Sequence, residues 1–401
     1  MTPAPRVYLD HAATTPMVPA AIAAMSEHLA HGGNASSLHA SGRQARRTVE
    51  ESRELIAERL GARPGEVVFV SGGTEADNLA TKGLFYARRD ADPGRLRVLS
   101  STVEHHAVLD PLLWLDKHAG AELDLVGVDA SGRLVTDELR AAIERDPSNI
   151  ALISCMWANN EVGTVQPVEE VVRLARAHAI PVHSDAVQAV GRLPVDFAAS
   201  GLDAMTVTAH KLGGPVGVGA LVMRRDLEAT PLLHGGGQER DLRSGTLNTP
   251  GIAAFATAVD LAVSGQVEEA ERLELLRARL VDGVRSLVSD VLVNGDPAAG
   301  PAHRLPGVAH FTFPGCEGDS LLMLLDAHGI ECSTGSACSA GVPQASHVLL
   351  AMGHDDMAAR GSLRFSLGHD STAADVDALL AVLPAVHERA QAANMAGTRG
   401  P

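Results

Sequence analysis

Short apolar runs alternate with amphipathic stretches over most of the first 250 residues, and this alternation restricts the fold more than any other feature of the chain. Stretches such as 167–179 carry apolar side chains every three or four residues, which is typical of helices packed on one face. Strands that alternate with helices predict an α/β domain with a mostly parallel, seven-stranded sheet and helices on both faces. The strand-like runs lie at 66–70, 97–100, 122–128, 150–154, 180–185, 204–208 and 217–223.

The pattern changes after about residue 250. A long amphipathic helix is predicted over 267–288, and short strands are predicted over 308–313 and 362–367. This change indicates a second, smaller α+β domain. The sequence therefore predicts a large α/β domain over 15–255, a small domain made of 1–14 and 256–392, and a flexible tail over 393–401.

Composition narrows the class of ligand. The chain has 401 residues, of which 45% are hydrophobic, so it can bury a sizeable core. A formal net charge of -16 argues against direct nucleic-acid binding, because phosphates repel an acidic surface. The N-terminal stretch lacks the apolar region of a signal peptide, and no apolar run has the length that spans a membrane. A cytoplasmic protein that binds small molecules is expected.

The cysteines are spaced too irregularly for a zinc site or a disulfide framework, so free thiols and no metal site are expected. Cys155 and Cys332 end apolar runs and are interpreted as small buried hydrophobes. Cys338 lies in STGSACSAG, among small and polar residues that favour an exposed loop. A lone thiol in a loop is more often inert than catalytic, so this pattern alone leaves the role of Cys338 open.

The chain has only three lysines. Lys82 and Lys117 lie in stretches that read as solvated helix surface. Lys211 follows the strand 204–208 and precedes a glycine-rich run that permits close approach of a ligand. Burial at a strand end would lower the pKa of this amine and free it for imine formation.

Other polar groups follow the neighbouring strands. Gly73 and Thr74 lie where a strand turns into a helix, which suits a phosphate group, although an ordinary capped turn has the same pattern. Asp185 could pair with a pyridine nitrogen or could cap a helix, and Gln188 follows it closely. His105 could stack on an aromatic ring or serve the structure alone. Because such strand ends converge in parallel sheets, these groups together with the lysine indicate pyridoxal phosphate.

The ordered motifs resemble those of the cysteine desulfurases, which belong to class V of the fold-type I pyridoxal-phosphate enzymes. The similarity spans almost the whole chain and its loop length is similar to that of the nitrogen-fixation and general iron-sulfur branch. Ala35 stands where a proline is usual, and Val216 where many relatives have a basic residue. The motifs are YLDHAATTP, GNASSLHASG, SGGTEADNLA, EHHAVLD, NNEVGTVQP, HSDAVQAVG, TAHKLGGPVGVGAL, HGGGQERDLRSGT, STGSACSAG and SLRFSLG.

The resemblance implies that Lys211 binds the cofactor covalently, Asp185 pairs with its pyridine nitrogen and His105 stacks on its ring. It also implies that Arg364 clamps the substrate carboxylate and that Cys338 accepts sulfur. The other implied roles are contacts to the oxygen side of the ring from Gln188 and Asn160, phosphate contacts from Gly73, Thr74, Thr208 and His210, a contact from Thr246 to the phosphate in the partner subunit, and substrate contacts from Asn34 and His39.

The resemblance therefore predicts a homodimer that removes sulfur from L-cysteine, releases L-alanine and passes a persulfide from Cys338 to an acceptor protein for iron-sulfur clusters or transfer-RNA thiolation. Selenocysteine lysis or another class V reaction is an alternative within the family. A thiol in the loop argues against transamination, which needs none. A third alternative is a silent paralogue that acts as a scaffold, which the full set of expected catalytic groups disfavours.

Overall fold

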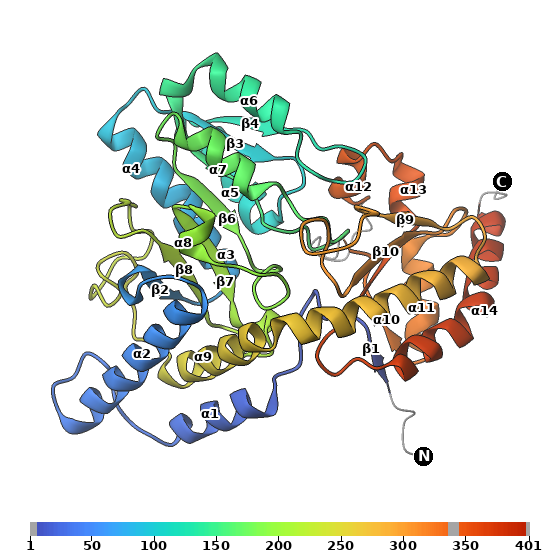
Figure 1. Ribbon diagram of the computed structural model, residues 1–401, viewed down its shortest axis with the longest axis horizontal. Coiled ribbons are helices and arrows are strands. Elements are labelled where there is room, and N and C mark those ends of the chain that lie inside the picture. The colour runs from blue at the N-terminus through green and yellow to red at the C-terminus, as the bar shows by residue number, and fades with distance from the viewer. Residues whose placement is uncertain (1–5, 336–344, 398–401) are drawn as a thin grey trace.

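A seven-stranded sheet forms the centre of the large domain in the computed structural model, which describes residues 6–335 and 345–397. Its strand order is β2-β8-β7-β6-β5-β3-β4, and only β8 runs antiparallel to its neighbours. The predicted mostly parallel sheet of seven strands is confirmed (Figure 1). The strands are β2 Val67–Val70, β3 Arg97–Ser101, β4 Glu122–Val126, β5 Ile150–Ser154, β6 Val182–Asp185, β7 Ala204–Thr208 and β8 Gly219–Met223.

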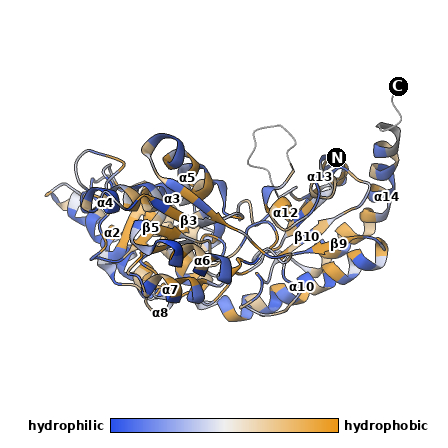
Figure 2. Ribbon diagram, turned by 90° about the horizontal axis from the view of Figure 1, so that it is seen from above, coloured by the Kyte–Doolittle hydropathy of each residue, from blue (hydrophilic) through white to orange (hydrophobic). Residues whose placement is uncertain are grey.

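Successive residues of these strands pack into different cores on the two faces of the sheet. In β2, Val67 and Phe69 join one buried cluster, whereas Val68 and Val70 join the other. Because side chains alternate across a strand, a continuous apolar run fills both cores at once. Figure 2 shows these apolar strands lying between helical layers. A sheet covered on both faces leaves its strand ends as the place for a ligand.

Helices cover both faces, as predicted. One core includes residues of α1 Pro19–Leu29, α2 Ala40–Arg59, α6 Thr136–Arg145, α7 Val168–Arg176, α8 Phe197–Ser200 and α9 Thr249–Ser264. The other includes residues of α3 Gly73–Asn78, the π-helical turn η2 Leu79–Gly83, α4 Leu84–Ala91 and α5 His106–Ala119. Short 3-10 helices are η1 Pro64–Glu66, η3 Pro147–Asn149 and η4 Ala209–Lys211.

The small domain has its own core around the antiparallel sheet β9-β10-β12 and the parallel pair β1-β11. Val7 of β1 pairs with Ile330 of β11, so the N-terminal segment belongs to this end of the molecule. Its elements are β1 Val7–Tyr8, α10 Gln266–Leu287, β9 Leu292–Asn294, β10 Val308–Thr312, α11 Gly318–Ala327, β11 Ile330–Glu331, α12 His347–Ala351, α13 Asp356–Arg360, β12 Ser362–Ser366 and α14 Ala373–Gly397.

Two helices cross the boundaries that the sequence predicts for the domains. The predicted division at 255 falls inside α9, whose buried side chains pack with the large domain as far as Val259. The core of the small domain begins at Leu273 in α10. Helix α14 continues to Gly397, beyond the predicted start of the tail at 393. An amphipathic pattern alone does not show where a helix changes partners.

Among residues 6–335 and 345–397, no single helix is long and apolar enough to cross a membrane. Helices α9 and α10 pass that test of length and composition only when they are taken together, and they are bent by 71° where they meet.

Candidate active site

A cavity of about 400 Å³ lies at the carboxyl ends of the parallel strands. Its walls come from the segments that follow β2, β3, β5, β6 and β7, from the N-terminal segment, and from β12. The fold thus brings together groups that are up to 352 positions apart, from Ala12 to Arg364. Ten of the predicted site residues line this cavity: Gly73, Thr74, His105, Asn160, Asp185, Gln188, Thr208, His210, Lys211 and Arg364.

Lys211 ends η4, directly after β7, and its amine points to the N-terminal segment. Nζ donates hydrogen bonds to the carbonyl oxygens of Ala12 and Ala13, the second at 2.6 Å. Burial lowers the pKa of Lys211 to about 7, and the positive charges of Arg364 and Arg192 act in the same direction. The amine is therefore poised to lose its proton near neutral pH, as imine formation or proton transfer requires.

Asp185 ends β6 with its side chain almost fully buried. The N–H of Val187 donates to Oδ1 at 2.9 Å, which stabilises the turn after the strand. Burial nevertheless raises the pKa of Asp185 to about 6. A buried carboxyl group of this kind needs a cationic partner to stay ionised, and a protonated pyridine nitrogen would supply one.

A second carboxyl group, Asp77, lines the same cavity and is 1% exposed. Its Oδ1 has no hydrogen-bond partner in the described part of the chain and lies 3.6 Å from Nε2 of His183. Burial raises the pKa of Asp77 well above the ordinary value, and the charge of Asp185 raises it further. Burial and the neighbouring Asp185 thus both disfavour the ionised form of Asp77.

His105 caps helix α5. The N–H of Ala107 donates to its Nδ1 at 3.1 Å, so the proton of the neutral ring is on Nε2. Burial lowers the pKa of His105 to about 4, and the charge of Lys211 lowers it further. The imidazole is thus neutral at physiological pH and held in a fixed orientation, which suits stacking on a flat ring.

Arg364 lies in β12, and its side chain is 4% exposed. Nη2 donates to Oδ1 of Asp10 at 2.7 Å, and Nη1 donates to the carbonyl oxygen of Asn160 at 3.0 Å. These contacts join the small domain to the N-terminal segment and to the large domain. The guanidinium group is held at the cavity wall in an orientation that suits a carboxylate ligand.

Gln188 contacts both the N-terminal segment and Arg192. Its Nε2 donates to the carbonyl oxygen of Ala12 at 2.9 Å, and its Oε1 accepts from Nη1 of Arg192 at 3.1 Å. The residues after Asp185 form turns, so Asp185 does not cap a helix there. Gln188 still lines the cavity, because the tight turn brings it back to the strand end.

Three predicted residues lie outside this cavity within the chain. Thr246 is exposed in the loop before α9. Asn34 accepts from the N–H of Ser36 at 2.9 Å, and Nδ1 of His39 caps α2 by accepting from Gly42. All three are exposed in this chain, so their predicted contacts remain predictions. Cys338 lies outside the described residues.

Other sequence interpretations had mixed outcomes. Cys155 is buried, as expected, whereas Cys332 is only partly buried. Lys117 is exposed, but Lys82 is partly buried with Nζ 4.5 Å above the ring of Trp114. The aliphatic part of a lysine side chain packs against the aromatic ring that its ammonium group covers. The spacing of apolar residues in the sequence does not reveal such a contact.

The sequence interpretation missed Asp77 and Asp10. Asp77 carried a signal, because it lies three residues after Thr74 in a helix and therefore shares its face. No sequence pattern pointed to Asp10, because its partner Arg364 is 354 residues away in the chain.

The fold and cavity define a class of protein: an α/β enzyme that presents a buried amine and a buried carboxyl group at the ends of parallel strands. Its architecture matches that of the fold-type I pyridoxal-phosphate enzymes. Residues 7–379 match the model of the family described as aminotransferase class-V, and the chain belongs to this family.

Individual relatives agree with this assignment. The chain is 59% identical to an "IscS-like cysteine desulfurase" of Mycobacterium tuberculosis over 97% of this chain and 98% of that protein. It is 42% identical to a "Cysteine desulfurase IscS" of Dictyoglomus turgidum over 96% and 95% of the two chains. A solved "NifS-like protein" is similar in structure, with a TM-score of 0.86, 35% identity and coverage of 96% and 99%. Another, titled "SspA in complex with cysteine", has a TM-score of 0.74, 31% identity and coverage of 90% and 98%.

Proposed function

We propose that this protein is a cysteine desulfurase that uses pyridoxal phosphate to remove sulfur from L-cysteine. The observation that carries the proposal is the meeting of Lys211, Asp185 and Arg364 in one cavity. An amine, a buried acid and a carboxylate-binding guanidinium are the groups that an amino-acid substrate and this cofactor require. The names of the relatives support the choice of cysteine as substrate.

The described residues fit the cofactor. The turn at the start of α3 has little space for a side chain at position 73, because a Cβ there would lie only 3.2 Å from Cγ2 of Val187. Glycine at this position keeps the backbone open to a ligand. Gly73, Thr74, Thr208 and His210 line this side of the cavity and would hold the phosphate. Lys211 would bind the aldehyde carbon and Asp185 would pair with the pyridine nitrogen. Pyridoxal phosphate, when bound, supplies an electron sink for the pair left by loss of the Cα proton.

The protein supplies binding and proton transfer. Arg364 would bind the substrate carboxylate with two parallel hydrogen bonds and orient the Cα–H bond toward Lys211. Lys211, once its amine is free and neutral, would accept that proton, since its pKa of about 7 matches the working pH. The neutral imidazole of His105 would pack on the ring and exclude water from that face.

Cys338 would accept the sulfur. Its thiolate would attack the sulfur atom of the substrate, and the carbon–sulfur bond would break with its electron pair passing to the carbon. The sulfur would remain on Cys338 as a persulfide, and the carbon would take up a proton to give alanine. The segment that carries Cys338 begins after Gly335, which lines the cavity. It ends before Ser346, whose Oγ donates to Oε2 of Glu161 at 2.5 Å.

We propose a homodimer with shared sites as well, in which Thr246 contacts the phosphate in the partner subunit and Asn34 and His39 contact the substrate. Their position at the surface, outside the cavity of their own chain, is what supports this proposal. The persulfide would pass to an acceptor protein for iron-sulfur cluster assembly or transfer-RNA thiolation.

The test is to incubate the purified protein with cysteine and a reductant and to measure sulfide and alanine in equal amounts. Cys338→Ser should abolish both products and leave the absorbance of the lysine-bound cofactor intact. Lys211→Ala should abolish that absorbance as well. Unchanged turnover in Cys338→Ser would refute the role of Cys338, and faster turnover of selenocysteine than of cysteine would favour the selenocysteine lyase.

A further inference from the structure

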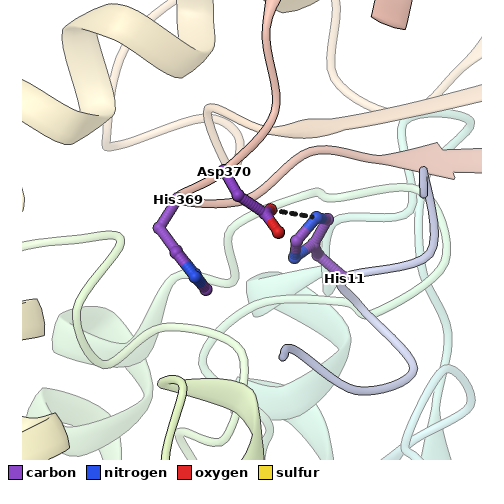
Figure 3. A group of neighbouring side chains, drawn as sticks. All are labelled: His11, His369 and Asp370. Atoms are coloured by element: carbon purple, nitrogen blue, oxygen red, sulfur yellow. Dashed lines mark ion pairs between the residues drawn. The ribbon is translucent and has the colours of Figure 1, made fainter. Parts of the chain in front are cut away.

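His11, His369 and Asp370 lie together at the junction of the N-terminal segment and the turn that follows β12 (Figure 3). Each residue offers one ligand atom, and these atoms lie within 4.8 Å of one another. Figure 3 shows the carboxylate of Asp370 directed at the ring of His11, with the ring of His369 beside them. None of the three residues lines the active-site cavity, although His11 directly precedes Ala12, which does, and His369 lines a second cavity together with Lys211.

The central distance suits a metal ion. Nε2 of His11 lies 3.1 Å from Oδ1 of Asp370. Two ligands at 2.0–2.1 Å from a tetrahedral zinc ion are about 3.3 Å apart, so this pair needs almost no movement. His369 is exposed, and its ring centroid is 6.1 Å from that of His11. A rotation of this surface side chain would bring its nitrogen to the third position.

Contacts on its Nδ1 side hold the ring of His11 in place. The side chain is fully buried, and Nδ1 lies 3.3 Å from Oγ1 of Thr15. A Cβ on Gly368 would lie 2.0 Å from Nδ1, so only glycine leaves room for the ring in this position. A hydrogen-bond partner on one ring nitrogen leaves the other nitrogen free to bind an ion, which is how metal-binding histidines are usually held.

We propose that His11, His369 and Asp370 bind one divalent transition-metal ion of the zinc class. Two imidazole nitrogens and one carboxylate oxygen suit zinc and similar ions, whereas magnesium and calcium prefer oxygen ligands. Three protein ligands leave a fourth position for water. No cysteine takes part in this group. The proposal therefore departs from the expectation of no metal site, which rested on the spacing of the cysteines alone.

Neighbouring charges set the strength of the site. Arg272 donates to the carbonyl oxygen of Gly368 at 2.8 Å and holds the turn in place, while its charge is paired with Glu269 at 2.8 Å. Arg192 donates to the carbonyl oxygen of His11 at 3.4 Å and to Oε1 of Gln188 at 3.1 Å. A cavity of about 370 Å³ opens beside His369 and is lined by Glu268 and Glu269, which gives a cation an approach. The positive charges of the two arginines repel a cation, and the negative charges of the two glutamates attract it and offset that repulsion.

A metal ion at this site would link the N-terminal segment to the turn that follows β12. His11 precedes Ala12 and Ala13, whose carbonyl oxygens accept from Lys211, and the other two ligands belong to the turn after β12. A metal bound only by the folded chain stabilises it, so the ion should raise the unfolding temperature.

The experiment uses the full-length, cofactor-loaded protein with its accessible thiols alkylated, so that cysteines do not bind the probe. Zinc binding is measured by equilibrium dialysis and metal analysis, and the unfolding temperature is measured with and without zinc. We expect wild type to bind one more zinc ion per chain than His369→Ala or Asp370→Asn, or to bind it at least about tenfold more tightly. Both variants change exposed side chains, so they should fold normally.

His178→Ala is the matched control, because His178 is an exposed histidine far along the sequence from this group. It should bind zinc and gain thermal stability as wild type does. The proposal is overturned if wild type binds no zinc, or if His369→Ala and Asp370→Asn match it in stoichiometry, affinity and zinc-dependent stabilisation. None of these readouts depends on desulfurase activity, so a failed metal site and a failed enzyme assignment remain distinguishable.

Discussion

Arg364 and Asp10 form an ion pair across 354 positions of the chain, with Nη2 and Oδ1 2.7 Å apart and the arginine side chain 4% exposed. The carboxylate holds one side of the guanidinium group, so its planar fork is oriented before a substrate arrives. Preorganisation of this kind lowers the cost of binding, because no side-chain freedom remains to be lost.

Arg364→Lys should lower kcat/KM for cysteine about 100-fold or more, because an ammonium group cannot make the paired hydrogen bonds. Steady-state alanine formation measures the effect. Arg279→Gln is the control, since Arg279 and Asp377 form an exposed pair elsewhere in the small domain. A value of kcat/KM in Arg364→Lys within threefold of wild type would contradict the carboxylate-binding role.

The pH dependence of stability should report on Asp185. The folded-state pKa of Asp185 is about 6, above the ordinary value of 3.8, so the folded protein holds this proton more tightly than the unfolded chain does. The free energy of unfolding of the cofactor-free protein therefore falls as the pH rises from 3.8 to 6. The shift corresponds to at most about 3 kcal/mol. Asp185→Asn should therefore unfold at a higher temperature than wild type at pH 8, and the difference should shrink at pH 4. Thermal scans of both cofactor-free proteins test this, and a less stable variant at pH 8 would contradict it.

The reactivity of Lys211 should show its lowered pKa directly. Because burial disfavours the ammonium form, acetylation of Lys211 in the cofactor-free protein should follow a titration with a midpoint near pH 7. Competitive labelling followed by peptide mass spectrometry measures the rate at each pH, with the exposed Lys117 as an internal reference for the reagent. A midpoint above pH 9 would show that the amine is not desolvated.

Glu239→Gln should destabilise the fold strongly. Glu239 is 2% exposed and accepts from Arg53 at 2.7 and 2.8 Å and from the N–H of Phe69 at 2.8 Å. Removal of the Glu239 charge leaves the buried Arg53 with only the exposed Glu50 as a charged partner, at a cost of up to about 3–5 kcal/mol. Thermal or denaturant unfolding measures the loss.

The control for that change is Glu51→Gln, in an exposed pair with Arg47 on the same helix. Exposed pairs contribute less than about 1 kcal/mol, so this variant should unfold almost as wild type does. Equal losses in the two variants would mean that burial of the Arg53–Glu239 pair has no effect on stability.

Much of the site could be predicted because its residues follow strands. Thr74, His105, Asp185 and Lys211 each lie just beyond an apolar run, and the rule that parallel strands end at one edge places them together. The positions of Asn34, His39 and Thr246 could not be predicted in this way, since no strand carries them to the cavity.

Local periodicity determined the strands, the order of helices between them and the candidate groups at their ends, because those properties depend on neighbours within a few residues. Tertiary structure alone decided the pairing of Arg364 with Asp10, the turn by which Gln188 meets Ala12, the change of partner between α9 and α10, and the meeting of His11 with His369 and Asp370. These contacts join segments that are up to hundreds of residues apart. They depend on how two separate cores pack against the N-terminal segment, and no pattern within a short window records that packing.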